Sequence, residues 1–162
     1  MNTVLIYGST YGTCTDISQR MVAILKEVDL FEVSAFDFST LKNYDKIILG
    51  TSTWGAGILQ QEWEKNIESL KSVDLSGKKV AIFGTGDQEG YPETFAEAIK
   101  DLNDIVLGCG ASVVGQWPIE GYEYESSRAV IDGKFVGLVI DEENQDELTD
   151  SRIEEWLLDI AF

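Results

Sequence analysis

Short runs of consecutive apolar residues alternate along the chain with longer amphipathic stretches. The short runs predict strands over residues 3–7, 31–34, 46–50, 79–84, 112–116 and 135–140. The longer stretches predict helices over residues 16–26, 61–70, 92–107 and 149–160. Because strands and helices alternate, and because the runs IILG and VAIFG contain no polar residue, the pattern predicts an α/β fold: a parallel sheet with helices on both faces.

Two segments depart from this alternation. Residues 36–44 are too few for a further helix and strand, and we expect a loop that crosses between two strands. Residues 117–134 (WPIEGYEYESSRAVIDGK) are rich in turn residues and aromatics and lack a helical period. We expect a long excursion between two halves of an edge strand, and loops of this length are usually functional or face a partner.

The length and charge of the chain limit what it can do. A chain of 162 residues is the length of one domain, so we expect a single domain over residues 1–162. Its 29 Asp and Glu against 12 Lys and Arg give a net charge of -17, which argues against nucleic acid and anionic membrane partners and favours a basic protein partner. The chain has no His, the most common general base and metal ligand, so we expect no metal site.

The cysteines and the N-terminus indicate the compartment. Two cysteines fit a reduced protein better than a disulfide framework. The N-terminal sequence MNTVLIYGSTYG lacks the basic region of a secretory signal, and no stretch approaches the roughly 20 apolar residues of a membrane span. We therefore expect a soluble cytoplasmic protein, and a monomer.

The loop after the first predicted strand, GSTYGTCTD (residues 8–16), has the composition of a phosphate-binding loop. Small residues between a strand and a helix N-terminus leave backbone N–H groups free to bind an anion. The loop has no Lys or Arg before Arg20, no GK[ST] ending and no GxGxxG pattern. It therefore predicts a site for a terminal monophosphate held by neutral donors; the alternative is an ordinary turn between strand and helix.

Two further glycine-rich loops each present one aromatic residue. TSTWGAG (residues 51–57) contains Trp54, and TGDQEGYPE (residues 85–93) contains Tyr91. Each aromatic, taken alone, could be a packing residue. All three loops follow strands of one parallel sheet and so lie at its carboxyl edge, where such folds bind ligands. Together they predict a site for a flat ring system that carries a phosphate.

The GSTYG loop, the TSTWGAGxLQQEWE segment and the GTGDQxGYP segment together resemble the flavodoxin family, and the resemblance covers essentially the whole chain. The stretch from WPIEGYEY to the C-terminal helix is similar to the long-chain subclass, whose insertion splits the fifth strand. The resemblance implies a doubly wound five-stranded parallel sheet in the order 2-1-3-4-5 and non-covalently bound FMN. It also implies low-potential one-electron transfer between a ferredoxin- or flavodoxin-NADP reductase and acceptor enzymes.

The resemblance also implies the roles of individual residues. Residues 9–15 would bind the phosphate, Trp54 and Tyr91 would stack on the two faces of the isoalloxazine ring, and Asp87 would lie near its pyrimidine side. Backbone groups of residues 51–55 and 84–88 would bind the polar edges of the ring. The expected FMN-binding residues are Ser9, Thr10, Tyr11, Gly12, Thr13, Cys14, Thr15, Thr51, Ser52, Thr53, Trp54, Gly55, Gly84, Thr85, Gly86, Asp87, Gln88 and Tyr91.

Two points of the phosphate loop stay open. Aligning its family pattern on Gly12 puts Tyr11 and Cys14 where hydroxyls are expected, whereas aligning it on Thr15 makes the loop one residue longer. Cys14 is either a small residue in a hydroxyl position or a reactive thiol, because a helix N-terminus lowers a thiol pKa. The other cysteine, Cys109, is expected to be buried packing.

Three functions are compatible with the fold. We expect an electron carrier rather than an enzyme. The alternative is a flavin-dependent NAD(P)H reductase, which would need cationic groups for the pyridine nucleotide, and the three loops carry no Lys or Arg between residues 8 and 19, 51 and 62, or 85 and 98. An acidic scaffold without a flavin would leave Trp54, Tyr91 and the phosphate loop unexplained.

Overall fold

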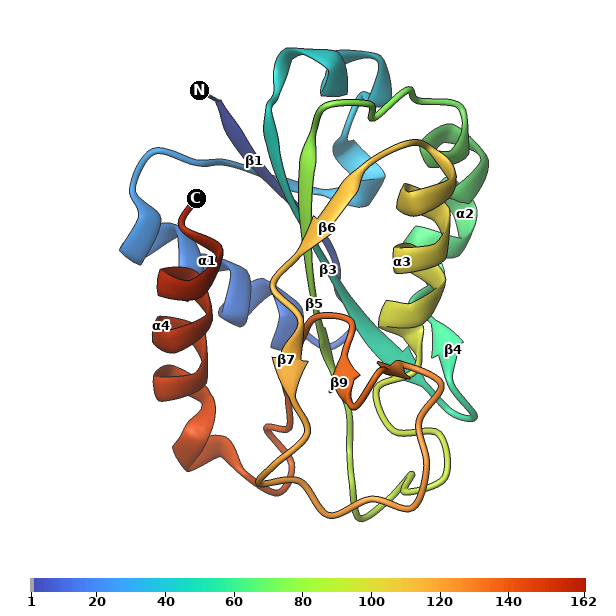
Figure 1. Cartoon of the computed structure of the whole chain (residues 1–162), viewed down its shortest axis with the longest axis vertical. Coiled ribbons are helices and arrows are strands. Elements are labelled where there is room, and N and C mark those ends of the chain that lie inside the picture. Colours follow the sequence, from blue (N-terminus) through green and yellow to red (C-terminus); the bar gives the residue numbers. More distant parts are fainter. Residues whose placement is uncertain (1) are drawn as a thin grey trace.

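A central parallel sheet forms the core of the protein, shown in Figure 1 as a computed structural model that describes residues 2–162. Its principal strands are β1 (Thr3–Gly8), β2 (Asp29–Glu32), β3 (Lys46–Trp54), β5 (Lys79–Thr85), β6 (Ser112–Val114) and β10 (Leu138–Ile140). Across the sheet the order is β10-β5-β3-β1-β2, with β6 also paired to β5. Strands β1, β3 and β5 lie in the middle, and their runs VLIY, IILG and VAIFG are buried, as expected for strands covered on both faces.

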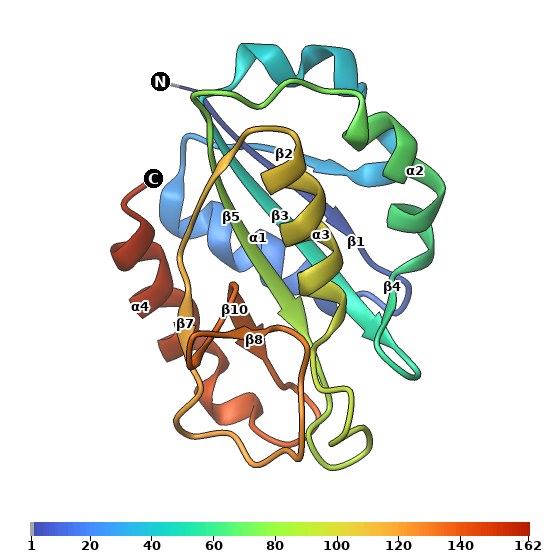
Figure 2. The ribbon, with the colours of Figure 1, turned by 45° about the vertical axis from the view of Figure 1, so that its right-hand side comes forward.

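Two helices cover each face of the sheet. Helices α1 (Thr13–Leu25) and α4 (Thr149–Ile160) pack together on one face, and α2 (Gln61–Lys71) and α3 (Ala98–Gly108) on the other (Figures 1 and 2). In α1 the buried residues recur every three or four positions, which gives one apolar stripe. The predicted doubly wound α/β fold is confirmed.

The fifth strand is divided between β6 and β10. Strand β6 pairs with residues 79–81 of β5, and β10 pairs with residues 83–85 along the same edge. Gly137 precedes β10, where any Cβ would overlap the Ile82 carbonyl, so the chain can rejoin the sheet there only as glycine. The predicted strand order and the splitting of the last strand are confirmed.

The insertion (residues 115–137), which joins the two halves, contains more regular structure than the expected loop. Strands β7 (Trp117–Pro118), β8 (Val130–Ile131) and β9 (Lys134–Phe135) form a small antiparallel sheet in the order β7-β9-β8. Asp132 and Gly133, with φ of 52° and 80°, form the two-residue turn between β8 and β9. Positive φ at both positions is typical of the tight turns that join antiparallel strands.

The segment between β2 and β3 differs from its prediction. Strand β2 ends at Glu32 rather than at residue 34, and residues 33–43 form the short helices η1 (Val33–Ala35) and η2 (Phe38–Asn43) instead of a loop. The carboxylate of Asp37 accepts a hydrogen bond from the Ser39 N–H at 3.0 Å and so caps η2. Burial of Phe38 and Leu41 then packs η2 on the core.

The third helix was predicted from residue 92 but begins at Ala98. The N–H groups of Glu125 and Ser126 in the insertion donate to the Pro92 carbonyl at 2.8 and 3.0 Å. Ala96 has a φ of 53°, which a right-handed helix cannot contain. Residues 92–97 therefore form turns that the insertion holds.

Two smaller differences concern the ligand-facing end of the sheet. Helix α1 begins at Thr13, three residues before its predicted start. The short strand β4 (Ile58–Leu59), which was not predicted, pairs antiparallel with the end of β3. None of the helices within residues 2–162 is long and apolar enough to cross a membrane.

Candidate functional site

A cavity of about 250 Å³ lies at the carboxyl ends of β1, β3 and β5, where the three predicted loops meet. The residues that line it are Ser9, Thr10, Tyr11, Thr13, Cys14, Ser52, Thr53, Trp54, Gly55, Thr85, Gly86, Asp87, Tyr91, Thr94, Ala96, Glu142 and Glu143. The chain thus brings three loops distant in sequence to one cavity, as the strand order predicts.

The N-terminus of α1 opens at this cavity without a side-chain cap. The residue before the helix is Gly12, with a φ of 88°, and its N–H donates to Ser9 Oγ at 3.0 Å. The Asp16 N–H donates to the Gly12 carbonyl at 3.0 Å, so the N–H groups of Thr13 to Thr15 have no partner in the first helical turn. Together with the helix dipole they favour an anion here.

Gln60 joins the first loop to helix α2. Its Nε2 donates to Thr10 Oγ1 at 3.1 Å, while its Oε1 accepts from the N–H groups of Glu62 (2.9 Å) and Trp63 (3.1 Å) and caps α2. The Gln60 side chain lies so close to Gly8 that a Cβ at that position would overlap it. The buried Gln60 amide therefore fixes the position of the Thr10 hydroxyl relative to the start of α2.

Three aromatic rings lie at the cavity. The side chains of Trp54 and Tyr91 line it from different loops, and Tyr91 is half exposed. Tyr11, which is 84% exposed, packs on Trp54 with ring centroids 5.3 Å apart and planes tilted by 37°. The hydroxyl oxygen of Ser52 is buried in the cavity wall and has no hydrogen-bond partner in the protein. Apolar ring surface beside an unpaired polar atom is the environment that a flat heteroaromatic ligand needs.

Asp87 is a carboxylate held in a fixed position at the edge of the cavity. Its Oδ1 accepts from the N–H groups of Gly90 (2.8 Å) and Glu89 (3.2 Å) and from Asn144 Nδ2 (2.8 Å). The hydrogen bond from Gly90 is the main reason that the pKa of Asp87 lies below its usual value, and Asn144 adds to it. Asp87 is therefore ionised at neutral pH.

Five of the expected site residues lie off the cavity wall: Gly12, Thr15, Thr51, Gly84 and Gln88. The Thr51 hydroxyl is buried and donates to the Ser52 carbonyl at 2.9 Å. Gln88 is buried, and both its N–H and its Nε2 donate to Asp141 Oδ2, at 3.0 and 2.7 Å. Thr51 and Gln88 thus support the loops from beneath, and the other thirteen expected residues line the cavity.

Four lining residues were not predicted: Thr94, Ala96, Glu142 and Glu143. Thr94 and Ala96 were assigned to a helix, which hid their place in a turn. Glu142 and Glu143 come one residue after the end of β10, and the carboxyl end of this strand lies at the same edge as the other three. The predicted position of the last strand was therefore sufficient to place Glu142 and Glu143 at the cavity.

The two cysteines differ in burial. Cys14 is fully buried, and burial raises its thiol pKa to about 12, which favours the small-residue interpretation over a reactive thiolate. Cys109 is half-buried rather than fully buried, with its Sγ 3.6 Å from the Leu70 carbonyl. Neither cysteine is positioned as a nucleophile.

The chemistry of the wall is acidic and neutral. The lining residues include Asp87, Glu142 and Glu143 but neither Lys nor Arg. Arg20, the cation of α1, is paired with Asp16 at 2.7 Å and with Asp150 at 3.0 Å, and it also lies 3.5 Å from the lining carboxylate Glu142. In the part of the chain from residue 2 onward, His, Cys, Asp and Glu form no cluster that could hold a metal ion.

Comparison with known proteins agrees with this arrangement. Residues 5–156 match the flavodoxin family. A flavodoxin from Trichodesmium erythraeum is 46% identical over 160 residues, which cover 94% of this chain and 92% of that protein. One from Picosynechococcus is 42% identical over 156 residues, with 94% and 92% covered.

The structural comparison gives the same result. A Fusobacterium nucleatum flavodoxin bound to flavin mononucleotide superimposes with a TM-score of 0.94 at 34% sequence identity, over 99% of this chain and 98% of that one. Because these matches extend over nearly the whole chain, and because an insertion divides the last strand of the sheet, the chain belongs to the flavodoxin family, in its long-chain subclass.

Proposed function

We infer that the protein is an electron carrier that binds FMN non-covalently in the cavity between its three loops. The observation that carries this conclusion is the joining, in one cavity, of an uncapped helix N-terminus with two aromatic side chains from other loops. The buried, unpaired hydroxyl of Ser52 is a second sign that the wall is completed by a polar ligand. When bound, FMN supplies the capacity to accept and release one electron at a time.

The residues have separate tasks in holding this cofactor. The N–H groups at the start of α1 and the hydroxyls of Ser9, Thr10 and Thr13 would bind the phosphate. Trp54 and Tyr91 would pack against the ring and exclude water from it. Residues 52–55 and 85–87 would bind its polar edges through the backbone.

The acidic wall supports a low reduction potential. Asp87 is ionised, and Glu143 adds a second carboxylate to the lining, whereas the charge of Glu142 is partly balanced by Arg20 at 3.5 Å. An added negative charge is disfavoured by nearby carboxylates and by the low dielectric of a site enclosed by aromatic rings. We therefore propose that the carrier works at potentials below those of free FMN.

Flavodoxins exchange electrons with other redox proteins, and the charge of this chain points to the kind of partner. A net charge of -17 favours partners with basic surfaces, such as a ferredoxin- or flavodoxin-NADP reductase, together with low-potential acceptor enzymes. The alternative function, an NAD(P)H reductase, requires direct binding of a pyridine nucleotide. A cavity wall without Lys or Arg does not favour such binding. We propose a carrier that acts as a monomer in the cytoplasm.

Binding and reduction measurements test the proposal. The unloaded protein is titrated with FMN and with riboflavin, and FMN should bind at least about a hundredfold more tightly, because each desolvated N–H left without the phosphate costs about 1–3 kcal/mol. Equal affinities would contradict the phosphate site. NADPH alone should leave the flavin absorption of the loaded protein unchanged until a reductase is added. Rapid bleaching by NADPH alone would support the reductase.

A further inference from the structure

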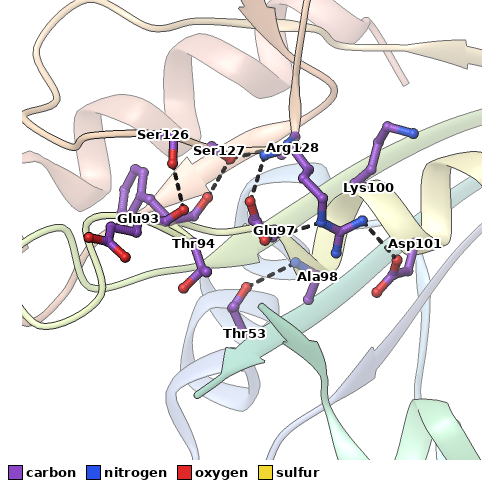
Figure 3. Close-up of polar contacts among 12 residues, drawn as sticks. Thr53, Glu93, Thr94, Glu97, Ala98, Lys100, Asp101, Ser126, Ser127 and Arg128 are labelled. Atoms are coloured by element: carbon purple, nitrogen blue, oxygen red, sulfur yellow. Dashed lines mark hydrogen bonds and ion pairs between the residues drawn. The ribbon is translucent and has the colours of Figure 1, made fainter. Parts of the chain in front are cut away.

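Three consecutive residues of the insertion hold the turn segment that precedes α3 (Figure 3). Ser126 Oγ donates to the Glu93 carbonyl at 2.7 Å, and Ser127 Oγ donates to the Phe95 carbonyl. Arg128 follows with contacts to a side chain. The insertion is thereby fastened to residues 93–97 along their length.

Arg128 supplies the partners of a buried carboxylate. The side chain of Glu97 is 7% exposed; its Oε2 accepts from the Arg128 N–H at 2.8 Å and its Oε1 from Arg128 Nε at 3.2 Å (Figure 3). The outer part of the Arg128 side chain is more exposed and lies 3.8 Å from Asp101 Oδ1. Glu97 is the buried member of this pair, and without the Arg128 side chain its carboxylate loses its charged partner, which is unfavourable for a buried charge.

Residues 94–98, which overlap the residues that the insertion contacts, in turn support the tryptophan loop (residues 53–57). The Ala98 N–H donates to Thr53 Oγ1 at 3.2 Å, and Thr94 Oγ1 donates to the Gly55 carbonyl at 3.5 Å. These contacts lie on either side of Trp54, the aromatic residue of this loop. The position of the loop therefore depends on the position of the segment.

Glu97 touches the tryptophan loop from its other side. A Cβ on Gly57, which has a φ of 82°, would lie 2.5 Å from Glu97 Oε1. The carboxylate that Arg128 holds is thus in close contact with the backbone of the loop. One residue, Glu97, connects the insertion with the ligand-facing loop.

The segment itself is strained. Ala96 has a φ of 53°, is 1% exposed and lines the cavity. A left-handed conformation is unfavourable for a residue with a Cβ and persists where surrounding contacts determine it. The contacts from residues 126–128 are such contacts.

We propose that Arg128 is a positioning residue for the cofactor site: its ion pair with Glu97 holds segment 94–98 and, through it, the tryptophan loop in the shape that receives the isoalloxazine ring. This deepens the proposed function, since the ligand of that loop is taken to be FMN. A loop that is already ordered before binding loses less entropy when the ligand binds. The insertion thus acts on the ring side of the cavity and leaves the phosphate side unaffected.

The test compares Arg128→Ala with a matched control, Lys100→Ala. Lys100 Nζ pairs with Asp104 at 2.6 Å on α3, so the control removes an ion pair close by that does not touch the tryptophan loop. Amide hydrogen exchange of the unloaded protein is followed in peptides covering residues 53–57 and residues 10–16. Arg128→Ala should raise exchange about tenfold in 53–57 and leave 10–16 unchanged, whereas Lys100→Ala should change neither.

Ligand binding gives an independent readout. Arg128→Ala should lower the binding affinities for FMN and for riboflavin by the same factor, about tenfold, because the phosphate side of the cavity is unchanged. The ratio of the two affinities therefore stays at its wild-type value, whereas damage to the phosphate side would change it; the unchanged exchange of residues 10–16 excludes a general loosening of the fold. The one-electron midpoint potentials of the loaded variant should shift as well, since the loop at the ring is less ordered.

Conservative variants keep the test decisive. Arg128→Lys retains the charge and should recover most of the affinity, whereas Glu97→Gln should reproduce the effect of Arg128→Ala; the backbone N–H of residue 128 is present in every variant. If Arg128→Ala does not fold, Glu97→Gln replaces it in both measurements. Unchanged exchange in 53–57 with affinities within twofold of wild type, or the same losses in Lys100→Ala, would overturn the proposal. Failure of the wild type to bind FMN would instead overturn the proposed function, because the exchange measurement needs no flavin.

Discussion

Gly55 and Gly57 both have positive φ in the tryptophan loop but differ in their surroundings. Gly55 (φ 46°) has no atom within 4 Å of a Cβ built on it, whereas Gly57 (φ 82°) has Glu97 Oε1 at 2.5 Å. An alanine at either position has a left-handed backbone, which costs about 1–2 kcal/mol. At Gly57 it also displaces a carboxylate whose two oxygens are both bound by Arg128.

We expect Gly57→Ala to lower the free energy of unfolding of the unloaded protein by at least about 1 kcal/mol more than Gly55→Ala. Urea unfolding followed by far-UV circular dichroism measures both variants. In an Arg128→Ala background the difference should shrink, because Glu97 can then move aside. Equal losses for the two glycines would mean that the Glu97 carboxylate is not held in place.

The thiols offer a second comparison between single residues. The pKa of Cys14 is raised to about 12 by complete burial, so at pH 8 only about one molecule in ten thousand carries its thiolate. The pKa of Cys109 is raised as well, by partial burial and by the charge of Asp74, but its side chain is half-buried and reachable. We expect iodoacetamide to alkylate Cys109 of the folded protein long before Cys14, as peptide mass spectrometry would show. Faster labelling of Cys14 would mean that the first loop opens.

At the scale of elements, the central strands could be predicted because burial on both faces requires consecutive apolar residues. β5 illustrates this, since its predicted range agrees with the observed strand to within one residue, whereas β3 continues four residues beyond its apolar run, to Trp54. The start of α3 could not be predicted, because Ala96 takes a left-handed conformation that only contacts from the distant insertion explain. The Asp132–Gly133 pair did indicate the tight turn between β8 and β9. The hairpin was missed because the residues around that pair are rich in turn formers and predict a loop.

The same reasoning applies to the cavity. Its three loops could be predicted because strand ends of a parallel sheet meet at one edge. Gln60 was missed because its role depends on Thr10 and on the cap of α2, which are apart in sequence. Side-chain supports of this kind become visible only when the packing of helices on the sheet is known.

Tyr122 connects the insertion to the sheet and gives this contact a pH dependence. Its hydroxyl donates to the Val139 carbonyl of β10 and accepts from Trp117 Nε1 at 2.9 Å. Burial raises the pKa of Tyr122 to about 12. Below pH 10 the phenol is neutral in both the folded and the unfolded chain, whereas at higher pH only the unfolded chain ionises readily, so stability is lost as pH rises toward 12.

We expect the free energy of unfolding of the wild type to fall more steeply above pH 10 than that of Tyr122→Phe, by up to about 1.4 kcal/mol per pH unit. At pH 7 the variant should be the less stable of the two, because it lacks both hydrogen bonds. Urea unfolding at a series of pH values measures the slopes. Parallel pH profiles would show that Tyr122 is reached by solvent.

At the scale of the whole molecule, the charge determines how the carrier meets its partners. The net charge of -17 arises without any His, so it changes little across neutral pH. Raising the ionic strength from 0.1 M to 1 M shortens the Debye length from about 10 Å to about 3 Å. We expect stopped-flow reduction by a basic reductase to slow by about tenfold or more over this range. A rate that is indifferent to salt would contradict electrostatic steering.

The uncapped start of α1 has a consequence for the amount of protein that a cell retains. The unpaired N–H donors at the start of α1 make the stability of the folded state depend on ligand supply. A ligand that binds only the folded chain adds about 2.7 kcal/mol to the free energy of unfolding at a concentration of 100 times its dissociation constant. A difference of this size alters the population open to proteases by about a hundredfold. We therefore expect newly made chains that find no FMN to be degraded preferentially, so that the abundance of the carrier follows the flavin supply without a dedicated regulator.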